Sequence, residues 1–165
     1  MPANLKAAIA ARARTEGFDA VGFTTPGAIA DAGQRLDRFL EEGRHGSMDW
    51  LAANADRRRD PRVLWPDARS VVVLGLTYGP DADPLECLGR PDKAVVSAYA
   101  RGADYHDLVK KKLKAVARWL AAEAGAGVKV FVDTAPVMEK PLAAAAGIGW
   151  QGKHTNLVSR DLGSW

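Results

Sequence analysis

The run Ser70-Val71-Val72-Val73-Leu74-Gly75-Leu76 decides the fold class of this chain. It is apolar and does not alternate with polar residues, a pattern typical of a strand that is covered on both faces. We therefore expect it to lie centrally in a sheet. Three other runs with strand-like patterns predict further strands at residues 18–23, 94–99 and 128–132.

Helical patterns separate these predicted strands. Apolar residues at helical spacing predict helices over residues 3–16, 26–42, 48–54 and 104–124, followed by a helix that carries residues 142–146. Gly17 and Gly125 follow two of them, where glycine commonly ends a helix. Charged and turn-forming residues predict loops at 56–62 and 79–92. The order of elements predicts an α+β fold (α/β layered), in which a mixed β-sheet is flanked by helices.

The composition is that of a soluble globular protein, and it excludes several kinds of site. The chain has 165 residues, enough for one domain with a core, and a formal net charge of +3. Its one cysteine, Cys87, excludes an internal disulfide and a self-contained iron–sulfur cluster, which takes four cysteine ligands. The histidines lack metal-ligand spacing, so no metal site is predicted. The sequence has no signal-peptide pattern and no long apolar run, so we expect a cytoplasmic protein that does not contact a membrane.

Two basic stretches each leave two interpretations open. The run Asp56-Arg57-Arg58-Arg59-Asp60-Pro61-Arg62 is either a solvated turn with internal ion pairs or a loop whose arginine grips an anionic ligand. In the predicted helix 104–124, four basic residues share one face, which either meets only solvent or contacts phosphate groups. These four residues are Lys110, Lys111, Lys114 and Arg118.

Asp133 follows the predicted strand 128–132 and opens the sequence Asp133-Thr134-Ala135-Pro136. One interpretation is structural: Asp133 or Thr134 caps the next helix, since proline suits the first helical turn. The other is catalytic: a carboxylic acid held at a strand end could donate a proton to a leaving oxygen. The sequence leaves both interpretations open.

A glycine-rich stretch follows, Gly149-Trp150-Gln151-Gly152-Lys153-His154-Thr155-Asn156. Its glycines let a ligand approach the backbone, Trp150 could stack on a flat ring, and the polar side chains offer hydrogen-bond donors. Alternatively, the stretch only turns the chain and Trp150 anchors the core. The string from Gly147 to Gly152 matches G-x-G-x-x-G, but it follows a predicted helix and lacks the strand that a dinucleotide-binding turn requires.

Several stretches, in this order, resemble the epoxyqueuosine reductases, the family that carries out the last step in making queuosine in tRNA. They are Asp60-Pro61 with the strand ending at Leu76-Thr77-Tyr78, Tyr99-Ala100-Arg101-Gly102-Ala103-Asp104-Tyr105-His106, Asp133-Thr134-Ala135-Pro136-Val137-Met138-Glu139-Lys140, and Gly147-Ile148-Gly149-Trp150-Gln151-Gly152-Lys153. The last two are the most specific. The chain resembles the N-terminal, cobalamin-binding part of that family.

This resemblance implies a cobalamin-binding domain similar to nitroreductase-like folds. In the family, electrons pass through two 4Fe-4S clusters to cobalamin, and the reduced cobalt removes the epoxide oxygen of epoxyqueuosine at the tRNA wobble position. The family's proposed proton donor falls on Asp133. The resemblance implies that the cobalamin-binding residues are Arg58, Asp133, Val137, Gly152, Lys153, His154, Thr155 and Asn156.

Two features depart from the family. His154 stands where the family usually has asparagine, and the cysteine-rich module that follows the family's Gly-Ser-Trp is absent here. We therefore expect residues 1–165 to form one cobalamin-binding domain, truncated before the iron–sulfur module, monomeric and inactive alone. An oxidoreductase of this kind needs an external electron donor and tRNA carrying epoxyqueuosine. A stand-alone corrinoid-binding module without catalysis is the alternative, and fold analogy alone suggests a flavin-dependent reductase.

Overall fold

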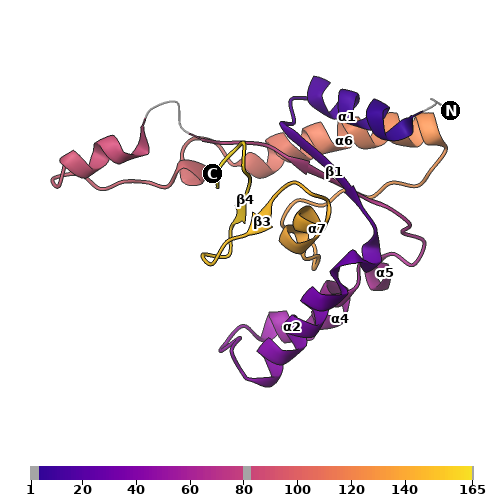
Figure 1. Ribbon diagram of the computed structural model, residues 1–165, viewed down its shortest axis with the longest axis horizontal. Coiled ribbons are helices and arrows are strands. Elements are labelled where there is room, and N and C mark those ends of the chain that lie inside the picture. The colour runs from indigo at the N-terminus through magenta and orange to yellow at the C-terminus, as the bar shows by residue number, and fades with distance from the viewer. Residues whose placement is uncertain (1–3, 80–82, 165) are drawn as a thin grey trace.

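The computed structural model describes residues 4–79 and 83–164, and an antiparallel ladder of two strands lies at its centre (Figure 1). β1 (Ala20–Thr24) pairs with β2 (Val71–Gly75) along the full length of both strands. The first two strand predictions are therefore confirmed. Among the described residues β2 pairs with β1 alone, so its predicted central place in a sheet is wrong.

Helices cover both faces of this ladder, which explains why β2 is apolar without alternation. On one face, α1 (Leu5–Thr15) and α6 (Tyr105–Ala124) lie side by side (Figure 1). On the other face, α7 (Glu139–Ala145) packs against both strands. Leu74 of β2 contacts the first core and Val73 contacts the second. The buried residues of the two cores are Ala13, Phe18 and Val116 in the first and Ile29, Ala32 and Leu142 in the second.

The chain between β1 and β2 forms a helical lobe, drawn in purple in the lower part of Figure 1. Its elements are η1 (Pro26–Ile29), α2 (Ala30–Glu41), α3 (Asp49–Ala53), α4 (Ala55–Arg59) and α5 (Pro61–Leu64). The helices predicted at 26–42 and 48–54 are confirmed, whereas the loop predicted at 56–62 is wrong. Charged side chains of that run stabilise the helices. Arg59 forms an ion pair with Asp37 of α2, and Asp60 caps α5 by accepting a hydrogen bond from the Arg62 N–H.

Two of the predicted strands do not form. Residues 94–99 lie on an arm that extends to the left in Figure 1 and carries η2 (Pro84–Gly89) and η3 (Ala98–Ala100). Residues 128–132 run from α6 toward Asp133 without a ladder partner among the described residues. Strand propensity alone does not supply a neighbouring strand.

The α+β class is confirmed, although the strands form two antiparallel ladders in place of one mixed sheet. In the second ladder β3 (Trp150–Gln151) pairs with β4 (Leu157–Val158). The helices predicted at the start of the chain, at 104–124 and around 142–146 correspond to α1, α6 and α7. Parts of three predicted features, at residue 3, at 80–82 and at Trp165, lie outside the described residues. None of the helices in residues 4–79 and 83–164 has the length and apolar character to cross a membrane.

Candidate active site

Asp133 lies in a bend between α6 and α7, with its backbone in the left-handed region at φ 52°. This conformation costs a residue other than glycine about 1–3 kcal/mol, so the surrounding contacts must hold it. Helix α7 begins only at Glu139, and Met138 occupies its N-cap position. The interpretation that Asp133 or Thr134 caps this helix is therefore wrong. The side chain of Asp133 is 54% exposed, so its carboxyl group is open to a ligand.

Glu139 holds the backbone of this bend. Its Oε1 atom accepts a hydrogen bond of 3.1 Å from the Asp133 N–H. Burial, and then the negative charge of Asp133, raise the pKa of Glu139. The two carboxyl groups thus have different surroundings: that of Glu139 is half-buried and structural, while that of Asp133 faces solvent. Such a difference commonly separates the roles of paired carboxyl groups.

Tyr105, the first residue of α6, donates a hydrogen bond from its hydroxyl to Oδ2 of Asp133. This bond, together with partial burial, raises the pKa of Tyr105 to about 12. Tyr105 therefore stays protonated near neutral pH and acts as a permanent donor. Its hydrogen bond orients the Asp133 carboxyl group.

His106 completes the cluster from the same helix start. Its ring stacks on Tyr105 with the ring centroids 4.3 Å apart, and its Nε2 lies 3.9 Å from Oδ2 of Asp133. On its other side, Nδ1 lies 2.6 Å from Oδ1 of Asp104, the N-cap residue of α6. Hydrogen bonds from the backbone and then the ring of His106 lower the pKa of Asp104. We call Asp104, Tyr105, His106, Asp133 and Glu139 the Asp133 cluster.

The glycine-rich stretch forms the β3–β4 hairpin. The Gly152 N–H donates to the Asn156 carbonyl, and the Thr155 N–H donates to the Gly152 carbonyl, each at 2.9 Å. A Cβ atom at Gly149 would lie 2.0 Å from the Val158 carbonyl oxygen, so this position accepts no side chain without a backbone shift. The stretch therefore does turn the chain, and it also exposes the predicted ligand-binding side chains at its tip: Lys153, His154, Thr155 and Asn156.

Two tryptophan side chains, those of Trp50 and Trp150, are more than half exposed and do not lie in the core. Trp150 is 52% exposed on β3, so the alternative interpretation in which it anchors the core is wrong. Trp50 of α3 is 56% exposed, and the guanidinium of Arg58 lies 5.3 Å from its ring. The Arg58 Nε is buried and has no hydrogen-bond acceptor among the described residues. Arg58 thus carries a charged donor that lacks an acceptor within the described residues, which suits an anionic or amide group of a ligand.

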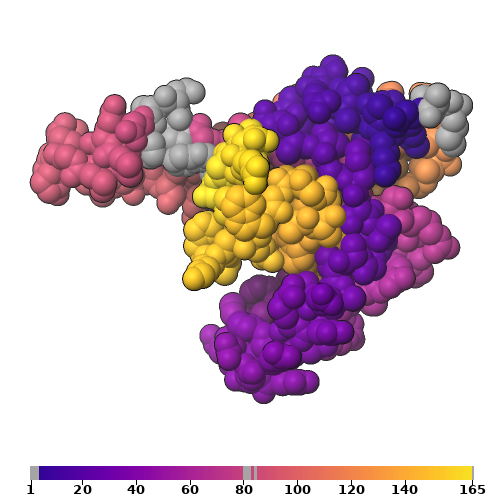
Figure 2. All heavy atoms as spheres, in the orientation of Figure 1, coloured from indigo at the N-terminus to yellow at the C-terminus, as the bar shows by residue number. Residues whose placement is uncertain are grey.

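The predicted cofactor-binding residues lie in separate parts of the structure: residues 152–156 share the β3–β4 hairpin, whereas Arg58 lies in α4 and Asp133 in the bend before α7. Val137 packs its half-buried side chain against the core around Ile29 and Leu142. In Figure 2 the hairpin, in yellow, and the helical lobe, in purple, share one face of the molecule. No hydrogen bond or ion pair within residues 4–79 and 83–164 joins Asp133 to Arg58 or to the tip of the hairpin.

Sequence reasoning missed Tyr105, His106 and Glu139 as members of the site. All three stand in the stretches that resemble the family, and all three are polar residues at a helix start. Tyr105 and Asp133 are 28 positions apart, and the fold alone makes them neighbours. A search for polar side chains in the first turn of α6 and α7 could have found these residues.

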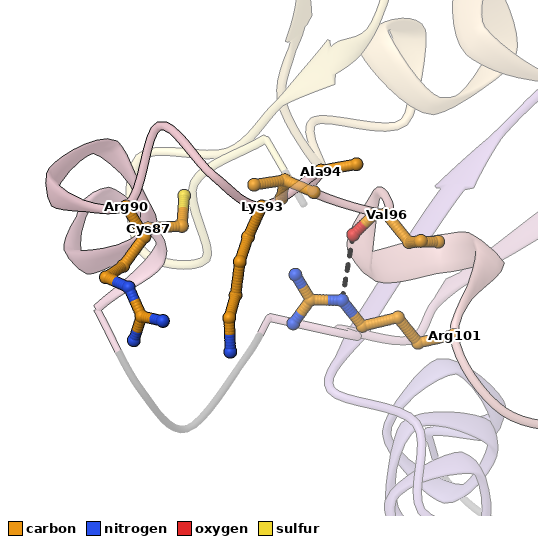
Figure 3. A pocket seen from close by; sticks show the side chains of 7 residues that line it. Cys87, Arg90, Lys93, Ala94, Val96 and Arg101 are labelled. Carbon is orange, nitrogen blue, oxygen red and sulfur yellow. Dashed lines mark hydrogen bonds between the residues drawn. The ribbon is translucent and has the colours of Figure 1, made fainter.

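Two other surfaces carry positive charge. The arm cavity, of about 430 Å³, is lined by basic and apolar side chains (Figure 3). Within it Arg101 donates to the Val96 carbonyl at 2.8 Å, and Arg90 pairs with Asp92. The basic face of α6 borders a smaller hollow of about 250 Å³ and forms no ion pair with the described residues. The arm cavity is lined by Cys87, Arg90, Lys93, Ala94, Val95, Val96 and Arg101, and the basic face consists of Lys110, Lys111, Lys114 and Arg118.

Comparison with known proteins gives a consistent result. Residues 58–134 match the family model described as epoxyqueuosine reductase QueG, DUF1730. An epoxyqueuosine reductase of Pseudomonas aeruginosa is 41% identical over 166 residues, which cover 99% of this chain and 46% of that protein. A crystal structure of epoxyqueuosine reductase with an epoxyqueuosine-modified tRNA stem loop is 26% identical, with a TM-score of 0.79, and the match covers 98% of this chain and 43% of that one. For the structure from Streptococcus thermophilus, the identity is 26% and the TM-score 0.78, with 98% of this chain and 44% of that one covered.

These matches agree with the motifs on which the resemblance rests. The chain spans about half the length of the curated relatives it matches. The resemblance is confirmed: the chain is similar to the N-terminal part of the epoxyqueuosine reductases.

Proposed function

We propose that this chain supplies the cobalamin-binding and proton-donating domain of an epoxyqueuosine reductase, which reduces epoxyqueuosine to queuosine at the wobble position of tRNA. The observation that carries the proposal is the Asp133 cluster: an exposed carboxyl group in a strained bend, held by Tyr105 and Glu139. The names of the relatives support it, and one similar structure contains an epoxyqueuosine-modified tRNA stem loop. The activity is that of the complete protein, of which residues 1–165 form the N-terminal domain.

The proposed reduction converts an epoxide to an alkene, consumes two electrons and two protons, and releases water. When bound, cobalamin supplies the reduced cobalt that delivers the electrons. Asp133 donates a proton to the epoxide oxygen as its C–O bond breaks. Tyr105 fixes the direction of that carboxyl group, and Glu139 fixes the backbone beneath it.

The residues of this chain are compatible with a bound cobalamin. The buried Nε of Arg58 lacks an acceptor among the described residues, and the tip of the hairpin presents polar side chains beside close-packed glycine backbone. In this proposal the cobalamin contacts are Arg58, Asp133, Val137, Gly152, Lys153, His154, Thr155 and Asn156. The 4Fe-4S clusters and the external electron donor belong to other parts of the system, because Cys87 is the one cysteine of the sequence.

The tRNA partner gives the basic face of α6 a role. Lys110 lies one helical turn after His106, so the basic face begins beside the Asp133 cluster and continues along the exposed side of α6. In this proposal the basic face contacts tRNA phosphates while the modified base reaches Asp133. A cytoplasmic location follows from the tRNA substrate.

Cobalamin binding is the first test, and it uses the 165-residue chain. Adding hydroxocobalamin should shift the absorption spectrum of the cofactor, and Arg58→Gln should weaken binding roughly tenfold, the loss expected for a charged hydrogen bond of about 1.5 kcal/mol. Arg57→Gln, which removes the neighbouring charge from an exposed position, is the matched control. Equal affinities for both variants would contradict the role of Arg58.

A second test separates catalysis from mere corrinoid binding. In the complete reductase, Asp133→Asn should abolish turnover of epoxyqueuosine while cobalamin stays bound through its other contacts. Full activity of this variant would remove the proton-donor role and favour a corrinoid-binding module. The single cysteine is the observation that keeps this alternative open.

A further inference from the structure

Asp104, His106 and Asp133 form a row of ionisable groups at the start of α6. Oδ1 of Asp104 accepts from the His106 backbone N–H at 2.9 Å and lies 2.6 Å from Nδ1 of the same residue. The backbone and ring of His106 are therefore fixed by one carboxylate. The ring also stacks on Tyr105 at 4.3 Å, which turns its free nitrogen, Nε2, toward Asp133.

We propose that His106 resupplies Asp133 with the proton that it gives up, an inference that rests on the proposed role of Asp133 as proton donor. After the carboxylic acid has protonated the leaving oxygen, Asp133 is a carboxylate. The protonated ring then transfers its Nε2 proton to Oδ2, which leaves Asp133 neutral and His106 in the Nδ1–H form, bound to Asp104. Solvent returns a proton to Nε2. His106 acts through Asp133 and does not contact the substrate.

The distances and exposure suit this transfer. Nε2 and Oδ2 are 3.9 Å apart, which is longer than a hydrogen bond but within reach after a small rotation of the ring or through one bridging water. The His106 side chain is 38% exposed, so its ring exchanges protons with solvent. Histidine is also the side chain that ordinarily changes charge near neutral pH.

The groups around the ring complete the arrangement. Asp104 and Tyr105 face it from α6, Asp133 faces it from the bend, and Glu139 lies behind Asp133. Lys110 follows one turn along α6. Tyr105, whose pKa is about 12, keeps its own proton, so the ring is the member of the cluster suited to carrying protons from solvent to Asp133.

The experiment follows the carboxyl ¹³C signal of Asp133 against pH by NMR, in the labelled 165-residue chain without cofactor or RNA. Besides its own titration, this signal should show a second step at the pH at which the His106 ring nitrogens titrate. The step should be lost in His106→Gln. In Asp104→Ser, whose hydroxyl still caps α6, the neutral ring should lose its preference for the Nδ1–H form. Asp107→Asn, which removes a carboxylate one residue further along α6, is the control and should leave both signals unchanged.

A wild-type titration without the second step, or a step that survives in His106→Gln, would overturn the proposal. If His106→Gln does not fold, two measurements still test the proposal: the wild-type titration curve of Asp133, and the protonated nitrogen of the neutral His106 ring in Asp104→Ser. The sample contains neither cobalamin nor tRNA. If the Asp133 signal does not respond to His106, the proposed role of His106 is wrong, but the proposed reduction of epoxyqueuosine is unaffected. If the chain does not bind cobalamin, the response of Asp133 to His106 is unaffected.

Discussion

The Asp133 cluster and the arm cavity both gather charged side chains, but the fold supports them differently. Asp133 is held by residues at the starts of α6 and α7, two helices that pack on opposite faces of the central ladder. In the arm cavity, Arg90 and Arg101 bond within the arm, and Val95 and Val96 stay more than half exposed. Proton transfer depends on positions fixed to fractions of an ångström, whereas attraction of an anion needs only charge near the surface. The packed core thus fixes the position of the Asp133 cluster and does not fix that of the arm cavity.

The largest expected difference between the two regions is in stability. Leu142 of α7 is 3% exposed and Leu88 of the arm is 76% exposed. Leu142→Ala should lower the free energy of unfolding by about 2–5 kcal/mol, because it opens a cavity in the core that Leu142 forms with Ile29 and Ala32. Leu88→Ala should change it by less than about 0.5 kcal/mol. Urea unfolding of both variants measures this, and similar losses would mean that the arm is packed as firmly as the core.

The second prediction concerns Tyr105. Replacing Asp133 with asparagine removes the main cause of its raised pKa, so that value should fall from about 12 toward the ordinary tyrosine value of about 10. Difference absorbance of the tyrosinate, with Tyr105→Phe to identify the step, follows the titration. A step that stays at about 12 in Asp133→Asn would show that Tyr105 and Asp133 are not in contact in solution.

The third prediction compares positive charge in the two regions by RNA binding. Replacing Lys110, Lys114 and Arg118 with glutamine should weaken binding of a tRNA stem loop roughly tenfold. It should also reduce the slope of log affinity against log salt by about 2. The same change at Arg90, Lys93 and Arg101 should have a smaller effect, because both arginines already bond within the arm. Fluorescence anisotropy at increasing salt provides both numbers, and a larger effect in the arm would move the predicted RNA contact there.

The smallest effect is expected at Glu139. Because its pKa is raised in the folded chain, Glu139 favours folding below its ordinary pKa of about 4.3, and this contribution is lost as pH rises through the raised value. Glu139→Gln keeps an oxygen for the Asp133 N–H and removes the buried charge. The variant should match the wild type near pH 4 and exceed its stability at pH 7. A variant that is less stable at pH 7 would show that the charge itself holds the bend.

The fold could be predicted where one segment carries its own information. The helix at 104–124 has a cap at Asp104, an apolar stripe and a closing Gly125, and it forms as predicted. Residues 94–99 and 128–132 have strand-like composition, but pairing depends on a second segment that composition does not reveal. The run 56–62 is helical, and Arg59 in it pairs with Asp37 of α2. Because these two residues are far apart in the sequence, the composition of the run does not reveal their contact.

The site shows the same limit. Asp133 could be identified from its own motif, and the structure shows it exposed and held by neighbours. Tyr105 and His106 stand at the start of the predicted helix 104–124, where a search for polar side chains could have found them, but nothing in their spacing pairs them with Asp133. The assignments of Arg58, Val137 and residues 152–156 to cobalamin rest on the family resemblance and stay predictions.

The left-handed backbone of Asp133 also limits which amino acids position 133 accepts. Asparagine and glycine adopt this conformation at least as readily as aspartate, while β-branched and bulky residues do so with difficulty. The backbone conformation alone would thus be satisfied by Asp, Asn or Gly, and a need for a carboxyl group distinguishes the first from the other two. An asparagine variant therefore changes the chemistry of this position and leaves its shape, which makes loss of function in that variant directly interpretable.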